Sequence, residues 1–174
     1  MRNILIAAAM LVSLPGLTLI TSPAHAVSLD VTCAGTETAT YNPGLLITSQ
    51  TTQVAVTGIL AACTSSDPGI TSGSYSENFP TTLSCATIFA GRAGTRTIRW
   101  SNGQSTTFEF TRAINNAAGQ ITVTFTGDAT SGEFTGDTVI EQVVFVTPNA
   151  LQCLAPPGLT QIGPGIATVT IDKL

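Results

Sequence analysis

Apolar and polar residues alternate with a period of two through most of the chain after residue 27. The clearest case is the segment 120–126, where Ile121, Val123 and Phe125 fall on one face and threonines fall on the other. Such alternation is typical of a β-strand with one face buried and the other in water. Helical spacing of apolar residues is not seen in this part of the sequence, so the pattern predicts an all-β protein.

The strongest local signal is a β-hairpin around Asn102-Gly103. The segment 97–100 places Ile98 and Trp100 on one face, and the segment 106–111 alternates in the same way. An Asn-Gly pair supplies the positive φ angles of a tight hairpin turn. Further strands are expected over residues 29–33, 36–41, 52–60, 83–89, 138–146 and 166–171.

Turn residues rich in Pro, Gly and Asn separate these short strands. Several short strands broken by such turns favour an antiparallel β-sandwich, immunoglobulin-like in general form, with a closed β-barrel as the alternative. The stretch 64–80 shows little alternation and is expected to be a long loop or a poorly paired edge. No linker or repeat divides the sequence, so one domain is expected over residues 27–174.

The first 26 residues have the pattern of a secretory signal peptide. Arg2 is followed by a mostly apolar run over residues 4–20, and the segment ends at Ala24-His25-Ala26, with small residues at the two positions that signal peptidase reads. Pro15 and Gly16 interrupt the run, which argues against a membrane anchor. We therefore expect an extracellular protein that begins near Val27 and has no membrane association after cleavage.

Charge narrows the range of partners. Without the first 26 residues the chain keeps all ten acidic residues and loses one basic residue of six, Arg2, and its only lysine is Lys173. Nucleic-acid binding needs clustered Lys and Arg, so nucleic acid is not expected as a partner. The expected partner is an unidentified extracellular protein or ligand.

Four cysteines, Cys33, Cys63, Cys85 and Cys153, lie beyond the signal segment. An even number in an exported chain predicts two disulfides, with three possible pairings. We prefer Cys33 with Cys63 and Cys85 with Cys153, because the first pair would join two early strands and the second would span the later ones. A zinc site is the competing interpretation, but the sequence has no C-x-x-C pair, so no metal ligands are assigned.

A series of short motifs occurs in one order along the chain. They are Cys33-x-Gly35, Tyr41-Asn42-Pro43-Gly44-Leu45, Cys63, Ser84-Cys85, the hairpin from Ile98 to Ser105, Gly132-Glu133-Phe134-Thr135-Gly136, and Cys153 followed by Pro156-Pro157-Gly158. Together they resemble a family of small secreted actinobacterial proteins of uncharacterised function. The resemblance implies an exported β-sandwich with paired cysteines, and it implies no catalytic residues.

The inventory of side chains excludes the commonest catalytic mechanisms. His25, the sole histidine, lies in the expected signal peptide, so neither a Ser-His-Asp nor a Cys-His mechanism is possible afterwards. No phosphate-binding glycine loop or dinucleotide motif is present, and no cofactor is expected. We therefore expect a protein that is not an enzyme.

Paired carboxylates are the remaining catalytic possibility, because glycoside hydrolysis needs only two. The candidates are Glu77, Glu109, Glu133 and Glu141. Glu109 alternates with inward phenylalanines and is expected to face water, whereas Glu141 is in phase with two valines. A carboxylate-dependent glycoside hydrolase is thus a distant alternative.

Two groups of charged residues are open to more than one interpretation. Asp128, Glu133 and Asp137 flank a glycine-containing turn, and whether they bind calcium is left open, because their spacing matches no calcium-loop motif. The second group contains Arg96, Arg99 and Arg112, which we expect on or near the outer face of the hairpin. They could form a patch that binds an anion or a partner, but cross-strand pairing with Glu109 and a role in solubility are the favoured interpretation.

The function expected from these observations is that of a secreted, non-catalytic structural or interaction module. A small-ligand carrier is the alternative, because the composition is similar to that of the secreted apoproteins of chromoprotein antibiotics. Trp100 is expected in the core and not on a binding surface.

Overall fold

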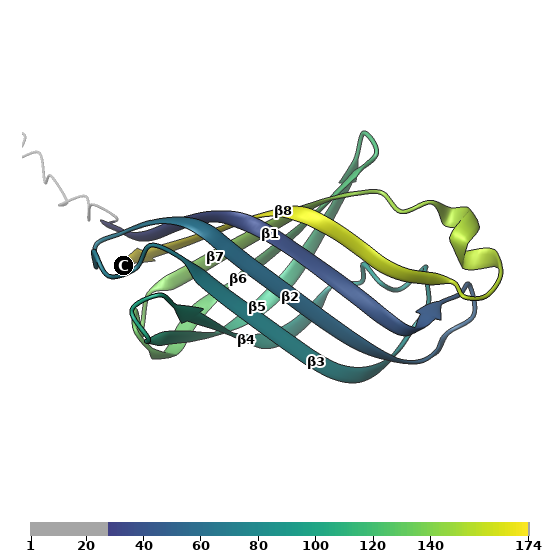
Figure 1. Cartoon of the computed structure of the whole chain (residues 1–174), viewed down its shortest axis with the longest axis horizontal. Helices are drawn as coiled ribbons and strands as arrows, with labels where there is room; N and C mark the ends of the chain where they lie inside the picture. Colours follow the sequence, from purple (N-terminus) through teal and green to yellow (C-terminus); the bar gives the residue numbers. More distant parts are fainter. Residues whose placement is uncertain (1–27, 174) are drawn as a thin grey trace, which may run out of the picture.

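A computed structural model describes residues 28–173, so the expected signal peptide lies outside the described residues. Eight antiparallel strands pair in chain order and close into a barrel (Figure 1). The strands are β1 (Ser28–Leu45), β2 (Gln50–Ser65), β3 (Gly73–Leu83), β4 (Arg92–Trp100), β5 (Ser105–Ala117), β6 (Gln120–Gly132), β7 (Thr138–Val146) and β8 (Leu159–Lys173). A short 3-10 helix, η1 (Ala150–Leu154), precedes β8.

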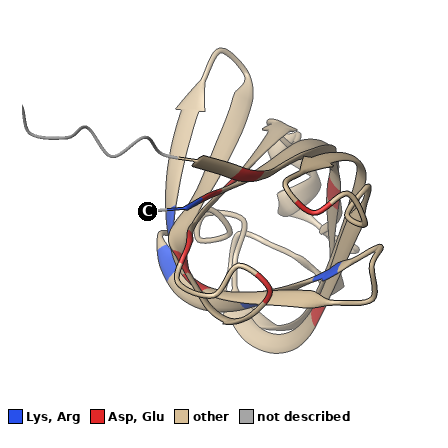
Figure 2. Cartoon of the chain, turned by 90° about the vertical axis from the view of Figure 1, so that its left-hand side faces the viewer, with Lys and Arg blue, Asp and Glu red and all other residues tan. Residues whose placement is uncertain are grey.

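The all-β, antiparallel class predicted from the sequence is confirmed, and the architecture is the barrel alternative in place of the expected sandwich. The barrel closes because β1 pairs with β2 on one side and with β8 on the other along most of its length. Register shifts in β1, such as the one between Ala34 and Thr36, let this long strand bend around the axis. Figure 2 shows the resulting ring of strands end-on.

The stretch 64–80 was expected to be a long loop or a poorly paired edge, and it contains both a shorter loop and such an edge. The loop covers only residues 66–72, since β3 pairs with β2 from Gly73 to Leu83, and on its other side β3 pairs with β4 at two positions only. One other expectation about an individual segment is wrong. The expected strand over residues 83–89 is a turn, in which the Ser84 amide donates to Thr87 Oγ1 at 2.9 Å. Local side-chain hydrogen bonding of this kind competes with strand pairing.

Disulfides join Cys33 to Cys63 and Cys85 to Cys153, which are the pairs preferred from the sequence. Cys33 and Cys63 are directly opposite each other on β1 and β2. The second disulfide ties the turn after β3 to η1, across 68 residues of chain. This disulfide fastens two connecting segments that make no strand pairing. It therefore contributes more to the shape of its end of the barrel than the Cys33–Cys63 disulfide contributes at the other end.

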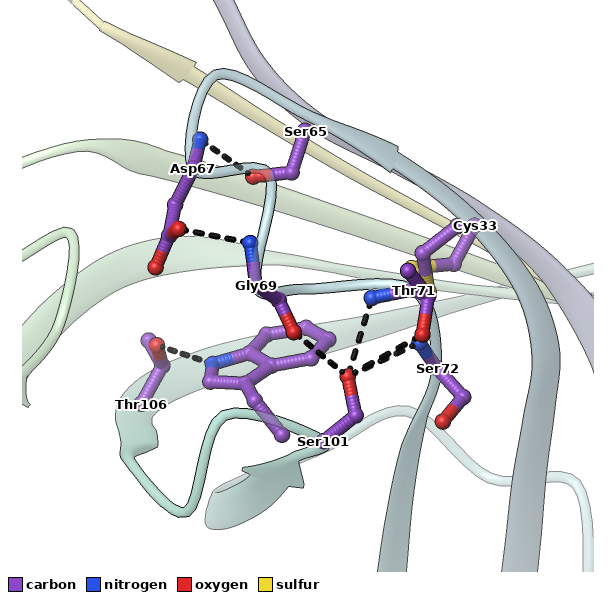
Figure 3. The surroundings of a disulfide bond; sticks show 10 residues. Cys33, Ser65, Asp67, Gly69, Thr71, Ser72, Ser101 and Thr106 are labelled. Carbon is purple, nitrogen blue, oxygen red and sulfur yellow. Dashed lines mark hydrogen bonds between the residues drawn. A yellow bond between two sulfur atoms is a disulfide. The ribbon is translucent and has the colours of Figure 1, made fainter.

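Side-chain hydrogen bonds connect the turns at the end of the barrel nearest Cys33 (Figure 3). The Trp100 indole is buried, as expected, and donates to Thr106 Oγ1 at 2.9 Å. Ser101 Oγ donates to the Gly69 carbonyl at 2.9 Å and accepts from the Thr71 amide, so the β2–β3 and β4–β5 turns are held together. Fully buried side chains fill the interior behind them, among them Val31, Leu60, Ile98, Phe108, Val139 and Ile171.

Candidate ligand-binding cavity

Arg96 points into the barrel, which corrects the expectation that it lies on the outer face of the hairpin. It is in phase with Ile98 and Trp100 on β4, and its side chain is only 2% exposed. Arg99, one position out of phase, is exposed. Arg112 on β5 lines the interior of the barrel, so its expected place on the outer face is wrong as well, and none of the three arginines forms an ion pair with Glu109. The alternation that placed Ile98 and Trp100 inward therefore also places a charged side chain in the interior.

Three carboxylates surround the Arg96 guanidinium. Glu37 Oε2 lies 2.9 Å from Arg96 Nη1 and Glu141 Oε2 lies 2.7 Å from the same nitrogen, while Glu77 Oε1 contacts Nε. The Tyr75 hydroxyl donates to Glu37 Oε2 at 2.8 Å. We call Arg96, Glu37, Glu77, Glu141 and Tyr75 the charged cluster.

Aromatic rings complete the surroundings of the guanidinium. Its central carbon lies 4.1 Å from the centroid of the Tyr75 ring and 4.7 Å from that of Phe125. A guanidinium is favourable over an aromatic face because the ring presents negative electrostatic potential there. Charge, hydrogen bonds and ring contacts together fix the orientation of Arg96 in the barrel.

Burial and charge shift the ionisation of the cluster. Burial raises the pKa of Glu141, and the nearby Arg96 offsets this only in part; Oε1 of Glu141 is buried without a hydrogen-bond partner. Burial by itself would lower the pKa of Arg96, but Glu141 and Glu37 raise it well above its usual value, so the guanidinium stays charged. Burial also raises the pKa of Tyr75, which remains a neutral hydrogen-bond donor.

A cavity of about 440 Å³ lies next to the cluster in the half of the barrel away from Cys33. Arg96, Glu37 and Glu77 form its polar wall on the side of the cluster, Tyr41 adds a buried phenol, and Arg92 and Arg112 also line it. The rest of the lining is largely apolar and includes Val54, Val56, Leu83, Ile88, Phe110 and Phe145. The charged cluster thus separates a packed half of the barrel from a hollow half.

The cavity reaches the surface where β3 and β4 diverge. These strands pair only at Gly73↔Trp100 and Ser74↔Arg99. The same register, continued, would set Glu77 opposite Arg96 and Thr81 opposite Arg92, and at both positions side chains bridge the strands in place of the backbone. We call this divergent region the seam; exposed residues on both of its strands line the cavity.

The other candidates from the sequence lie outside the cavity. Glu109 is exposed, as expected, and faces Asp128 across β5 and β6. Glu133 accepts a hydrogen bond from Asn102 at 3.0 Å, and Asp128 accepts one from Thr138 at 3.3 Å, so the acidic turn does not converge on one point. Among residues 28–173, no group of three His, Cys, Asp or Glu side chains is arranged to hold a metal ion.

Sequence reasoning missed Glu37 and Tyr75. Glu37 is in phase with the buried Ala39 and Tyr41 on β1, so alternation gave a usable signal. Tyr75 lies within the segment that was expected to be a loop or a poorly paired edge, and its inward position could not be derived without recognising β3. Glu141 and Glu77, two of the four candidate carboxylates, are both in phase with buried residues; Glu141 is fully buried and Glu77 is partly buried.

Comparison with known proteins gave no match to a family model, to a curated protein or to a solved structure. The fold and the site define an eight-stranded antiparallel barrel that has two disulfides and a cavity in one of its halves. The two disulfides are compatible with an extracellular protein. Within residues 28–173, no helix has the length and apolar character needed to cross a membrane.

Proposed function

We propose that the protein is a secreted, non-catalytic carrier that binds one small, largely apolar molecule in the barrel cavity. The observation that carries this proposal is the cavity of about 440 Å³ between the charged cluster and the seam. Ligand pockets commonly have volumes of ~300 to 1,000 Å³, with apolar walls and a few polar groups. An eight-stranded barrel is wide enough to hold one small ligand.

The seam supports the proposal because it supplies a way in. A complete β3–β4 ladder would cover the cavity with backbone hydrogen bonds, whereas the observed ladder ends after Ser74 and Arg99. The two side-chain bridges beyond that point can open without unpairing a strand. A small ligand can therefore enter laterally while the other strand pairs keep the barrel closed.

The arrangement of carboxylates favours binding over glycoside hydrolysis. Glu141 is fully buried and does not line the cavity, so it cannot reach a substrate there. Glu37 and Glu77 line the cavity but are held by Arg96. A general acid and a nucleophile must both contact the scissile bond.

A substitution that fills the cavity tests the proposal. Ala39 is 5% exposed and lines the cavity, whereas its neighbour Thr40 is exposed on the outer face. The neutral fluorophore N-phenyl-1-naphthylamine should bind the wild type with 1:1 stoichiometry. Its affinity should fall at least ~10-fold in Ala39→Phe, which is about 1.4 kcal/mol, and stay unchanged in Thr40→Phe.

Fluorescence titration measures these affinities, and circular dichroism shows whether each variant is folded. Val54→Phe fills the same cavity from β2 and serves as a second variant if Ala39→Phe does not fold. Absence of binding to the wild type, or equal affinity in the folded cavity-filling variants, would contradict the proposal.

A further inference from the structure

Two arginines at the edge of the cavity have no acidic partner. Arg92 and Arg112 are directly opposite each other on β4 and β5, and both line the cavity. Every ion pair between an arginine and a carboxylate among residues 28–173 is made by Arg96. Like charges directly opposite in a sheet repel each other, so the pair is unfavourable unless an anion lies between them.

The hydrogen bonds of Arg112 leave one of its N–H groups without a partner. Its Nη2 donates to the carbonyls of Ile88 and Ala90, in the turn that follows β3. Its Nε is buried and has no hydrogen-bond partner. Burial, and secondly the charge of Arg92, lower the pKa of Arg112, and the charges of Tyr41 and Glu37 offset this only in part.

Arg92 is exposed and makes one long contact, from Nη1 to Thr81 Oγ1 at 3.4 Å across the seam. Glu37 is the acidic residue whose charge acts on Arg112, but its Oε2 is held by Arg96 and Tyr75. No carboxylate among residues 28–173 forms an ion pair with either of the two guanidinium groups.

We propose that Arg92 and Arg112 bind the anionic head group of the cavity's ligand, which is therefore an amphipathic organic acid with an apolar body. This inference rests on the proposed function, and it adds the charge and orientation of the ligand. Guanidinium groups bind carboxylate and similar oxyanions through paired hydrogen bonds. The apolar body lies inward, against side chains such as Ile88, Phe110 and Phe145.

A matched pair of fluorophores separates the head group from the body. 8-Anilinonaphthalene-1-sulfonate carries the same two aromatic units as N-phenyl-1-naphthylamine and adds one sulfonate. The anionic fluorophore should bind the wild type at least ~10-fold more tightly than the neutral one, and the preference should decrease as salt is added. In Arg92→Gln and Arg112→Gln the affinity for the anionic fluorophore should fall ~10-fold, with the neutral fluorophore unaffected.

Arg99→Gln is the matched control, because Arg99 lies on β4 but faces outward. It should bind both fluorophores like the wild type, and Arg92→Lys should keep most of the preference because it keeps the charge. Arg112→Gln also loses contacts to the turn after β3, so Arg92→Gln is the decisive variant if Arg112→Gln does not fold.

The outcomes distinguish the two proposals. If the wild type binds the neutral fluorophore but shows no preference for the anion, the head-group inference is wrong and the cavity proposal stands. The same holds if Arg99→Gln loses as much affinity for the anion as Arg92→Gln. If neither fluorophore binds, the proposed function itself fails, and the head-group inference fails with it.

Discussion

Replacing Arg96 by methionine should destabilise the barrel by about 3 to 5 kcal/mol, the usual cost of removing one partner from a buried ion pair. Methionine fills similar space but leaves Glu37, Glu77 and Glu141 together in the interior with no cation. Urea unfolding of the two proteins measures the difference. Arg99→Met, on the outer face of the same strand, is the control and should change the free energy of unfolding by no more than ~0.5 kcal/mol.

The loss of stability in Arg96→Met should change with pH in a defined direction. Burial raises the pKa of Glu141 above its value in the unfolded chain, and Arg96 opposes that shift. A carboxyl group whose pKa is higher in the folded than in the unfolded protein stabilises the folded state at pH values below its unfolded pKa. This stabilisation is lost as the pH rises through the folded pKa. Without Arg96 the pKa of Glu141 is raised further. The loss of stability relative to the wild type should therefore be smallest near pH ~4.5 and grow toward neutral pH.

Adding Glu37→Gln and Glu141→Gln to Arg96→Met should recover much of the stability at neutral pH, because it removes the unpaired buried charge. A deficit that is independent of pH, or a single variant as stable as Arg99→Met, would contradict the role assigned to the charged cluster.

Replacing both Cys85 and Cys153 with serine should lower the free energy of unfolding by about 4 kcal/mol. The reason is that the unfolded chain gains conformational entropy when a loop of this length is no longer closed by a disulfide. The disulfide closes 68 residues of sequence. The turn that it fixes carries Ile88 and Phe89, which line the cavity. We therefore expect weaker binding of N-phenyl-1-naphthylamine as well as lower stability.

The Cys33–Cys63 disulfide provides the comparison. It closes 30 residues and joins strands that pair with each other directly, at the packed end of the barrel. Its removal should lower the free energy of unfolding by about 3.6 kcal/mol and leave fluorophore affinity unchanged. Chemical denaturation and fluorescence titration of both double variants check this. A loss below about 1 kcal/mol for the Cys85 and Cys153 variant, or equal effects on binding, would show that this disulfide does not shape the cavity.

Alternation along the strands predicted which residues lie inside wherever it was clear. Ile98, Trp100 and Phe108 are buried as expected, and the same phase carries Arg96 inward. Its charge was the reason for the wrong assignment, since arginine is almost never fully buried unless it is paired. The pairing depends on Glu37 and Glu141, which are remote in sequence, so it was not visible at position 96 alone.

Barrel closure and the cavity could not be derived from the sequence. A sandwich and a barrel share the same two-residue period, and the difference lies in the pairing of β1 with β8, at opposite ends of the described chain. In β3 the inward positions Tyr75 and Glu77 alternate with serines, so inward and outward residues are both polar and the period is hidden. The sequence therefore indicated the weak pairing of this segment, as the alternative of a poorly paired edge, but not the strand β3 or the opening beside β4.

A crystal structure of the protein grown with N-phenyl-1-naphthylamine tests the central claim most directly. The proposal predicts one fluorophore inside the barrel, against Val54, Val56 and Phe145, next to the charged cluster. A fluorophore bound only on the outer surface, or a barrel whose side chains fill the space beside Arg96, would contradict it.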